Sequence, residues 1–396
     1  MPGPESPAPA CRLAVVVHRP VPYYVALYRQ LAAQADIDLT VLYCSGGERH
    51  DEGYGQAVDW GVDLMAGYRS RVFRNWSPWP DRPGFLRYVT PGLLWALLVG
   101  GYDAVYAHSL NYATTALALL AARMRGRRVL YRADAYNLGE RSGAKRAVRR
   151  AVYSRTFRLA DRLLYIGTHN RAFYTAFGVP ESKLVPVPFV VDNARFAAEA
   201  DRLAGQTVEL KRSFGIPADR RVLLFTGKFQ AKKQPVRLVE AFARTRARRD
   251  WTLLMVGDGE LRPAAEQCAT ALGLDNVVFA GFLNQNEVGR AYACADVLAL
   301  PSAYQETWGL VVNEAMNFRC AIVVSDRVGC APDLVEGICG LVVPHDDIQA
   351  LADAIDTLAA DPALLARYQA AAPERIAQWR LPQAVAGIRA ALGLPA

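Results

Sequence analysis

Short apolar runs alternate with longer amphipathic stretches along most of this 396-residue chain. In the first half, six such runs are expected to form strands: residues 13–18, 38–43, 104–107, 128–132, 163–166 and 184–187. Most of these runs lack the alternation of polar and apolar residues that marks a half-exposed strand. Continuous apolar runs of this length are typical of parallel strands that helices cover on both faces.

The second half repeats the pattern with six further runs: residues 221–226, 251–256, 277–279, 297–300, 321–325 and 340–343. Helical stretches separate them, and Gly257, Gly259 and Gly281 lie at strand ends, where sharp turns are needed. This alternation favours parallel sheets between layers of helices. The sequence therefore predicts an α/β protein with two Rossmann-like, doubly wound domains.

The domain boundary is expected just after the proline-containing stretch that starts at residue 185, where one series of strands and helices ends. We assign residues 1–192 to the first domain and residues 193–379 to the second. The last segment, about 380–396, is expected to be a helix that returns to the first domain. Because ligands of open α/β sheets bind outside the carboxyl ends of the strands, we expect the site in the cleft between the domains.

The composition is that of a globular protein, with 52% hydrophobic and 21% charged residues. The first ten residues, MPGPESPAPA, have neither a basic start nor an apolar run, so they are interpreted as a disordered tail rather than a secretory signal. The longest apolar stretch, residues 91–101, is about half as long as the roughly 20 residues that span a membrane. It is expected to be a core or interfacial segment.

The cysteines and histidines give no sign of a disulfide framework or a metal centre. The seven cysteines include no Cys-x-x-Cys pair, and the five histidines form no His-x-x-x-His or His-Glu-x-x-His pair. We therefore expect a reducing, cytoplasmic environment and neither a metal nor another cofactor.

The net charge of +8 belongs to the first half. Residues 1–196 hold 25 lysines and arginines against 15 acidic residues, whereas the remainder holds 21 against 23. The most basic stretch, residues 141–162, has the pattern of a helix. It is either a solvated helix face or a surface that attracts an anionic acceptor or acidic lipid headgroups.

The stretch from residue 301 to 326, PSAYQETWGLVVNEAMNFRCAIVVSD, carries the most informative chemistry. Glu306 lies in a polar turn, and Gly309 precedes an apolar helix that holds Glu314. Glycine permits close approach of a ligand, and the start of a helix presents unpaired N–H groups that suit an anion. Glu314 is placed to accept both hydroxyls of a ribose, and Glu306 is placed to bind a sugar attached to the phosphates.

This stretch resembles the retaining glycosyltransferases of family 4, which have the GT-B fold of two Rossmann-like domains facing across a cleft. Their signature is two glutamates separated by seven residues, here Glu306 and Glu314. The resemblance implies that Glu314 holds the ribose of a nucleotide sugar and that Glu306 binds the donor sugar. It also implies that the main chain of Trp308, Gly309 and Leu310 meets the sugar and the diphosphate.

A second similarity follows the first strand of the second domain, in the run TGKFQAKKQ. Gly227 and Lys233 agree with the family pattern, while Lys228 replaces an arginine, Lys232 an acidic residue and Gln234 a glycine. Two cations at the carboxyl end of a strand can neutralise a diphosphate and stabilise the charge that develops on the leaving group. The alternative is an exposed, lysine-rich loop.

Further similar segments are VGDGELRP, FAGFL and ADVLALPS, which occur in the family's order. Within FAGFL, Phe282 and Leu283 would flank the nucleobase. The resemblance covers nearly all of residues 221–347 and extends more loosely over the first half.

The first half departs more from the family. The run HRPVPYY replaces the glycine-rich loop of many relatives, and Arg132 occupies the place of a histidine that lies close to the reacting sugar. Either Arg132 contacts a phosphate of donor or acceptor, or Asp134 contacts an acceptor hydroxyl. His108 ends a predicted strand and is either catalytic or structural.

Asp36 and Asp38 mimic the Asp-x-Asp metal motif of another glycosyltransferase architecture. They precede a predicted strand and are interpreted as a turn and a cap, with no metal.

The predicted reaction transfers a sugar from a nucleotide-diphosphate donor, UDP more than GDP, to a hydroxyl acceptor, with retention of the anomeric configuration. An anionic or lipid-linked acceptor is expected, in the synthesis of envelope polysaccharide or glycolipid, with peripheral contact at the inner membrane surface. One alternative is glycosylation of a small natural product, and a second is a sugar-nucleotide 2-epimerase. A third, which rests only on the basic first half, is a protein that binds nucleic acid or a membrane surface. For the favoured glycosyltransferase, no nucleic-acid partner is expected.

Overall fold

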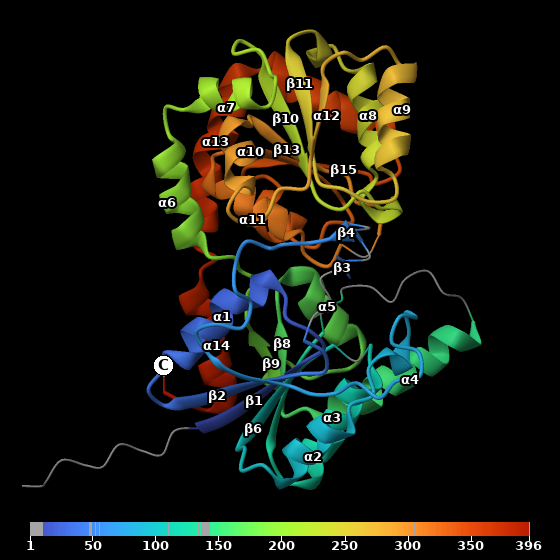
Figure 1. Cartoon of the computed structure of the whole chain (residues 1–396), viewed down its shortest axis with the longest axis vertical. Coiled ribbons are helices and arrows are strands. Elements are labelled where there is room, and N and C mark those ends of the chain that lie inside the picture. Colours follow the sequence, from blue (N-terminus) through green and yellow to red (C-terminus); the bar gives the residue numbers. More distant parts are fainter. Residues whose placement is uncertain are drawn as a thin grey trace, which may run out of the picture.

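The computed structural model describes residues 11–46, 50–51, 53–54, 56–109, 111–133, 135, 143–304 and 306–395. The expected tail at residues 1–10 and the candidate Asp134 lie outside these ranges. Figure 1 shows the chain as two bodies, each with a central sheet between helices.

The first sheet has seven strands in the order β5-β2-β1-β6-β7-β8-β9. They are β1 Cys11–Val17, β2 Ile37–Tyr43, β5 Arg69–Val72, β6 Ala104–His108, β7 Arg128–Arg132, β8 Arg162–Tyr165 and β9 Leu184–Pro186. All neighbouring strands are parallel. Helices α1 (Pro22–Ala32) and α14 (Leu381–Leu392) cover one face. Helices α2 (Pro91–Val99), α3 (Ala113–Met124), α4 (Ala144–Leu159) and α5 (Thr168–Ala176) cover the other.

The second sheet has six strands in the order β12-β11-β10-β13-β14-β15. They are β10 Arg221–Thr226, β11 Trp251–Val256, β12 Val277–Gly281, β13 Val297–Leu300, β14 Ala321–Ser325 and β15 Gly340–Val343, all in parallel pairs. Helices α8 (Pro235–Arg244), α9 (Arg262–Ala271) and α12 (Ile348–Ala360) pack on one face. Helices α10 (Val288–Cys294) and α11 (Leu310–Asn317) pack on the other.

The remaining elements are peripheral helices and single turns. Helices α6 (Asn193–Leu203) and α7 (Thr207–Ser213) pack against α10, and α13 (Pro362–Ile376) packs against α11 and α12. The short turns are η1 Phe85–Arg87, η2 Glu181–Lys183, η3 Ala231–Lys233, η4 Ala247–Arg249 and η5 Ala331–Val335.

The predicted fold class and all twelve predicted strands are confirmed. Along β1, Leu13, Val15 and Val17 are buried in one core cluster. Ala14 and Val16 are buried in another, on the opposite face. Burial on both faces explains why the strands appear in the sequence as unbroken apolar runs.

Sequence patterns missed the edge strand β5 and the short hairpin of β3 (His50–Asp51) and β4 (Gln56–Ala57). β5 has the sequence Arg-Ser-Arg-Val and lies largely exposed at the edge of its sheet. An edge strand has little apolar surface to bury, so its sequence carries no strong strand signal.

Helix α14 packs on the first domain, although it is the last helix along the described chain. It contacts α1, β8 and β9. An added Cβ on Gly387 would lie 2.1 Å from the carbonyl oxygen of Pro186, so helix and strand are in direct contact. Arg389 of α14 donates hydrogen bonds of 2.6 and 2.9 Å to the carboxylate of Asp36, which precedes β2.

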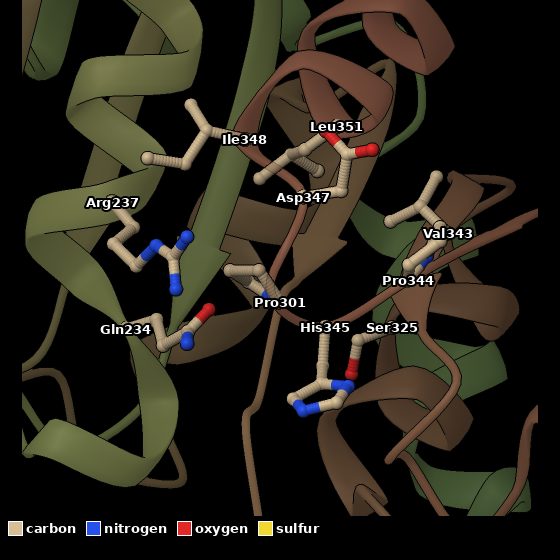
Figure 2. Close-up of a pocket in the computed structure, with 10 residues that line it drawn as sticks. All are labelled: Gln234, Arg237, Pro301, Ser325, Val343, Pro344, His345, Asp347, Ile348 and Leu351. Atoms are coloured by element: carbon tan, nitrogen blue, oxygen red, sulfur yellow. The ribbon is translucent and has the colours of Figure 1, made fainter.

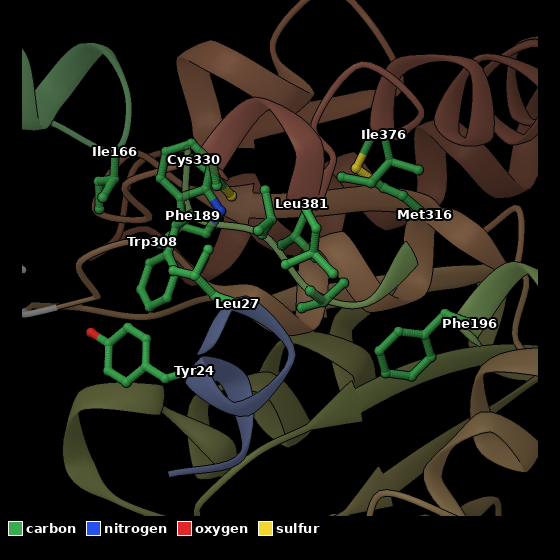
Figure 3. Close-up of a cluster of buried hydrophobic side chains, with 14 of the residues drawn as sticks. Tyr24, Leu27, Ile166, Phe189, Phe196, Trp308, Met316, Cys330, Ile376 and Leu381 are labelled. Atoms are coloured by element: carbon green, nitrogen blue, oxygen red, sulfur yellow. The ribbon is translucent and has the colours of Figure 1, made fainter. Parts of the chain in front are cut away.

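The two domains share one buried cluster, part of which Figure 3 shows. It runs from Tyr24 and Leu27 of α1 through Phe189, which precedes the second domain, to Trp308. A polar contact adds to this interface: Asp333 of η5 accepts hydrogen bonds of 3.0 Å from the main-chain nitrogen and 2.7 Å from the hydroxyl of Thr168, at the start of α5.

Candidate active site

Glu306 lies at an edge where two neighbouring strands of the second sheet end. β10 and β13 pair in parallel, so the turn η3 that follows β10 lies near the loop that follows β13. Lys233 of η3 forms an ion pair with Glu306, and Ser302 donates a hydrogen bond of 3.1 Å to the same carboxylate oxygen, Oε2. Only 9% of Glu306 is exposed. The structure thus brings two predicted site residues into direct contact.

Lysine charge dominates the surroundings of Glu306. Burial alone would raise the pKa of Glu306, but the charges of Lys233 and Lys232, with hydrogen bonds from Lys233 and Ser302, lower this pKa below its ordinary value. Burial lowers the pKa of Lys232, and the nearby charges of Lys233 and Lys228 act in the same direction. One carboxylate balances only part of the charge of three lysines, so this edge of the sheet favours an added anion.

Gln234 fixes the turn that carries Lys233. Its φ of 54° lies in the left-handed region, which glycine adopts most easily. The family usually has a glycine at this position, and glycine would suit this conformation. With its side-chain nitrogen turned toward them, Gln234 donates to the carbonyl oxygens of Pro301 at 2.9 Å and His345 at 3.1 Å. Figure 2 shows these residues around a pocket of about 10 Å³, which has room for about one water molecule. The two bonds tie the end of η3 to the loops that follow β13 and β15.

Glu314 lies in α11, in a different electrostatic environment. Tyr292 of α10 donates a hydrogen bond of 2.7 Å to Glu314 Oε2, and the hydroxyl of Tyr292 lies 3.1 Å from that of Thr226 at the end of β10. Burial raises the pKa of Glu314 to about 7, and the hydrogen bond from Tyr292 and the charge of Arg195 oppose this only in part. Near neutral pH this carboxyl group is therefore divided between its charged and neutral forms.

Gly309 sets the start of α11. Its φ of 96° lies in the left-handed region, and an added Cβ would lie 3.0 Å from the side chains of both Leu300 and Val328. Both conformation and space therefore require glycine. The start of a helix presents N–H groups that suit an anion. Here Val312 already donates to the carbonyl oxygen of Gly309 at 2.9 Å, so the N–H groups of Leu310 and Val311 are the candidates.

The side chain of Trp308 serves the domain interface. It is 2% exposed, and its indole nitrogen donates a hydrogen bond of 2.9 Å to Asn313, which in turn donates to the carbonyl oxygen of Phe189 at 3.1 Å. An added Cβ on Gly167 of the first domain would lie 2.4 Å from the Trp308 ring. The ring is thus packed between the domains, and the main-chain carbonyl of Trp308 accepts a hydrogen bond of 3.0 Å from Cys330. The predicted main-chain contact of Trp308 with a ligand stays a prediction.

His108 and Arg132 are adjacent on the first domain. They end β6 and β7 and pair in the register of these strands. His108 Nε2 lies 3.4 Å from the hydroxyl of Tyr28, and the guanidinium carbon of Arg132 lies 4.2 Å from the centroid of the Phe189 ring. Both side chains are buried, at 2% and 1% exposure. Because Phe189 also contacts α11 through Asn313, the pair lies on the first-domain side of the same junction.

A segment of the first domain reaches the second domain beside the lysines. This crossing segment, residues 53–54 and 56–61, includes β4, and Figure 1 shows β3 and β4 against the second domain. The carbonyl oxygen of Trp60 accepts a hydrogen bond of 3.3 Å from the main chain of Gln285, and that of Gly61 accepts one of 2.7 Å from the side chain of Asn286. The segment is therefore attached to the loop that follows β12.

Two aromatic side chains of the crossing segment meet the predicted nucleotide site. The rings of Tyr54 and Phe282 lie 4.8 Å apart between centroids, and those of Trp60 and Phe282 lie 6.0 Å apart. Lys228 Nζ lies 5.0 Å from the centre of the Tyr54 ring. Leu283 packs against the shared core instead. Phe282 and Lys228, both predicted site residues, thus contact the same tyrosine.

Four residues at this site were missed by sequence reasoning: Tyr54, Trp60, Tyr292 and Ser302. Tyr292 lies in a helical stretch typical of core elements, and Ser302 lies just after a strand, where sequence reasoning considered only Glu306. Tyr54 and Trp60 lie in the run GYGQAVDWG, which has neither helical nor strand periodicity. Two large aromatic residues in a glycine-containing loop were the signal that could have identified them.

The aspartate pair at the start of β2 forms two separate ion pairs. Asp36 binds Arg389, as described above, and Asp38 binds Arg69 at 3.0 Å. Each carboxylate therefore has its own arginine.

All seven cysteines are free thiols, and burial raises the pKa of each; that of Cys44 rises to about 11.

Family comparisons match both domains. The family described as glycosyl transferases group 1 matches residues 206–375, and the glycosyl transferase 4-like domain family matches residues 16–189. The chain belongs to the family 4, group 1 glycosyltransferases. The resemblance predicted from Glu306 and Glu314 is thereby confirmed at the level of the family.

Among curated relatives, alpha-D-kanosaminyltransferase of Streptomyces kanamyceticus is 34% identical over 47% of this chain and 49% of its own length. The GDP-mannose-dependent alpha-(1-6)-phosphatidylinositol monomannoside mannosyltransferase of Mycolicibacterium smegmatis is 30% identical over 61% of this chain and 64% of its own. The chain spans about half the length of most curated relatives that it matches.

Solved structures agree on the fold. HepE from Anabaena, in complex with UDP and glucose, has a TM-score of 0.74 at 18% identity, over 97% of this chain and 99% of its own. The lipopolysaccharide glycosyltransferase WaaG has a TM-score of 0.69 at 17% identity, over 96% and 98%. Among the residues that the structure describes, no helix is both long and apolar enough to cross a membrane.

Proposed function

We propose that this protein transfers a sugar from a nucleotide-diphosphate donor to a hydroxyl group of an acceptor held by the first domain. The observation that carries the proposal is the buried Glu306–Lys233 ion pair beside Lys232 and Lys228, at the carboxyl end of β10. The surplus of positive charge at this edge of the sheet suits a diphosphate. The sugar donors of this family carry a nucleoside diphosphate, which would provide that group.

In this proposal Lys233 changes its partner when the donor binds. Without a donor, Lys233 and Ser302 both contact Glu306 Oε2. A diphosphate that attracts Lys233 would leave that carboxylate oxygen able to accept a hydrogen bond from a hydroxyl of the donor sugar. Lys228 and Lys233 would then stabilise the charge that builds up on the departing phosphate. No metal is needed for this step, because the lysines supply the positive charge.

The ribose would be held by Glu314 in its charged form. The base would lie near Phe282, with Tyr54 and Trp60 of the crossing segment beside it. UDP is the proposed nucleotide, since HepE was solved with UDP and glucose. GDP is the second candidate, supported by the GDP-mannose-dependent relative.

Retention of the anomeric configuration is part of the proposal. The route is an internal return, in which the departing phosphate accepts the proton of the acceptor hydroxyl on the same face of the sugar. Nearby lysine charge lowers the pKa of Glu306, so this carboxylate is a weak proton acceptor and the departing phosphate is the proposed base. Proton NMR of the first-formed product is expected to show the donor's anomeric configuration, and an inverted centre would overturn this part.

For the acceptor, we propose an anionic or lipid-linked molecule of envelope glycolipid or polysaccharide synthesis, at the cytoplasmic side of the inner membrane. Its support is the basic first domain and the relative that acts on a phosphatidylinositol mannoside. The alternative acceptor is a small natural product, which the similarity to the kanosaminyltransferase supports.

A panel of sugar nucleotides tests the function. Slow acceptor-independent hydrolysis of one donor is expected and would identify both base and sugar. Its loss in Glu306→Gln would tie the activity to this site. Conversion of UDP-N-acetylglucosamine to its 2-epimer without an acceptor would instead support the epimerase, and an unchanged rate in Glu306→Gln would refute the donor-site assignment.

A further inference from the structure

Helices α2 and α3 carry apolar side chains on the face that points away from their core. In α2, Leu93 and Leu97 are buried, while Trp95 and Val99, on the opposite side, are 66% and 58% exposed. A surface helix normally presents polar residues to water, and one that is apolar all round normally has a partner on each side. The outer face of α2 has none among the described residues.

Helix α3 continues this apolar surface. Leu117, Leu120 and Met124 follow one another at helical spacing and are 46%, 44% and 72% exposed. The two helices pack directly against each other. Their outward-facing residues therefore belong to one area of the first domain rather than to isolated positions.

The loop between β5 and α2 adds aromatic side chains to this area. Trp76 and Trp79 are 67% and 48% exposed, and Phe85 is 53% exposed. The loop is held in place: the main-chain nitrogen of Trp76 donates to Val89, and Ser77 donates to Leu86 at 2.6 Å. The turn η1 within it contacts α3. These rings are thus displayed on a bonded loop.

Charge accompanies the apolar side chains. Residues 69–128 contain nine arginines, two aspartates and neither lysine nor glutamate. One of the aspartates, Asp103, forms an ion pair with Arg12. The guanidinium carbon of Arg74 lies 5.5 Å from the ring centre of Trp76, so cationic and aromatic groups are interleaved. Of the fifteen exposed large hydrophobic residues in the described chain, ten lie in these same 60 residues.

We propose that this surface, formed by α2, α3 and residues 72–87, docks on a lipid bilayer that contains anionic phospholipid. Tryptophan is favoured at the boundary between headgroups and acyl chains, and arginine binds phosphate there while its stem covers apolar surface. Partial insertion of apolar side chains with attraction to acidic lipid is the physical basis of interfacial binding. The surface is distinct from the donor site and does not depend on the proposed sugar transfer.

The excess of positive charge favours a bilayer over a protein partner. Tryptophan, methionine and arginine are also frequent in protein interfaces. The nine arginines of residues 69–128 outnumber the acidic groups, even though Arg69 and Arg123 form ion pairs with Asp38 and Asp161, and this excess matches anionic headgroups. Arg74 lies against the exposed Trp76 ring. The basic helix α4, interpreted from the sequence as either a solvated face or a surface that attracts an anionic acceptor or acidic lipid, contacts α3.

Vesicle co-sedimentation of the full chain tests the proposal. The protein is expected to bind vesicles of equal phosphatidylcholine and phosphatidylglycerol at least about tenfold more strongly than vesicles of phosphatidylcholine alone. Lipids brominated high on the acyl chain are expected to quench part of its tryptophan emission. Absence of binding to the acidic vesicles would overturn the proposal, as would equal binding to both.

Two sets of variants localise the contact. The triple change Trp76→Ser, Trp79→Ser and Trp95→Ser is expected to remove the bromine quenching and to weaken binding about tenfold or more. The double change Val208→Ser and Leu272→Ser, at exposed apolar positions of the second domain, is the matched control. All five side chains are exposed, so unfolding temperatures should be unchanged. Unaltered vesicle binding by the triple variant, or a wild-type dimer that this variant dissociates, would refute the assignment.

Discussion

Glu306 and Glu314 lie eight positions apart in the sequence, yet their surroundings act on them in opposite directions. Lysines and a serine hydroxyl hold Glu306 in its charged form, with a pKa below its ordinary value. Burial raises the pKa of Glu314 to about 7, and the hydrogen bond from Tyr292 opposes this only in part. One motif thus supplies a carboxylate that is charged at neutral pH and, eight positions further along the chain, a carboxyl group that titrates near neutral pH.

The largest expected effect comes from removing the negative charge of Glu306. Glu306→Gln leaves Lys233 beside a neutral amide and removes the acceptor proposed for the donor sugar. We expect transfer to fall by at least about 100-fold, a loss typical of a transition-state contact. Steady-state rates measured with donor and acceptor check this. Glu181→Gln, at an exposed ion pair of the first domain, is the control and should retain activity.

The same pair of residues predicts opposite dependences of stability on pH. The pKa of Glu306 is lowered from 4.5, so its stabilising contribution is present above pH 4.5 and is lost as the pH falls. The pKa of Glu314 is raised from 4.5 to about 7, so its neutral form stabilises the fold at low pH and this contribution is lost as the pH rises toward 7. Urea unfolding of Glu306→Gln and Glu314→Gln at pH 5 and pH 8 compares them. Relative to wild type, Glu314→Gln should gain stability at pH 8 and Glu306→Gln should lose it.

Donor binding should follow the titration of Glu314. Because the ribose hydroxyls need a charged acceptor, we expect the KM for the donor to rise about tenfold from pH 8 to pH 6. Glu314→Gln should have a high KM at both pH values. A wild-type KM that is flat over this range would contradict the ribose role while leaving the role of Glu306 untouched.

The crossing segment gives a smaller effect. Tyr54→Ala removes a ring that contacts both Phe282 and Lys228. A pair of this kind contributes about 0.5–1.5 kcal/mol, so the KM for the donor should rise about two- to tenfold with kcat little changed. Val208→Ala, at an exposed apolar position of α7, is the comparison. Equal effects of the two changes would argue against a nucleotide contact by Tyr54.

The smallest effect is expected from Gln234→Gly, a change at the residue that follows Lys233 and holds it in place. Gln234→Gly relieves a left-handed conformation worth about 1–2 kcal/mol but loses two hydrogen bonds of about 1 kcal/mol each, so stability should change little. Gln234→Ala loses the bonds and keeps the strain, and should be less stable by about 1–2 kcal/mol. Denaturant unfolding distinguishes them; a more stable alanine variant would contradict the two bonds to Pro301 and His345.

The sequence predicts the donor half of the site better than the rest, and the reason is physical. Glu306, Gly309 and Glu314 lie on one short turn and helix, so their spacing along the chain determines their spacing in the fold. Tyr54 and Phe282 are 228 positions apart, and their contact depends on how the two domains pack. Likewise, the sequence could not show which side of α3 is exposed. Leucines at helical spacing are typical of a buried face, and nothing in the pattern distinguishes a buried leucine stripe from an exposed one.

Helix α14 has a consequence for synthesis of the protein. The first sheet is among the earliest parts of the chain to be made, but α14, which covers β8 and β9 and places Arg389 on Asp36, is made after every strand of the second sheet. On the ribosome, the second domain can therefore complete its core before the first does. Premature termination between α13 and α14 would leave the helices of the second domain in place but the first sheet uncovered, a form that aggregates or is degraded rather than one that binds acceptor.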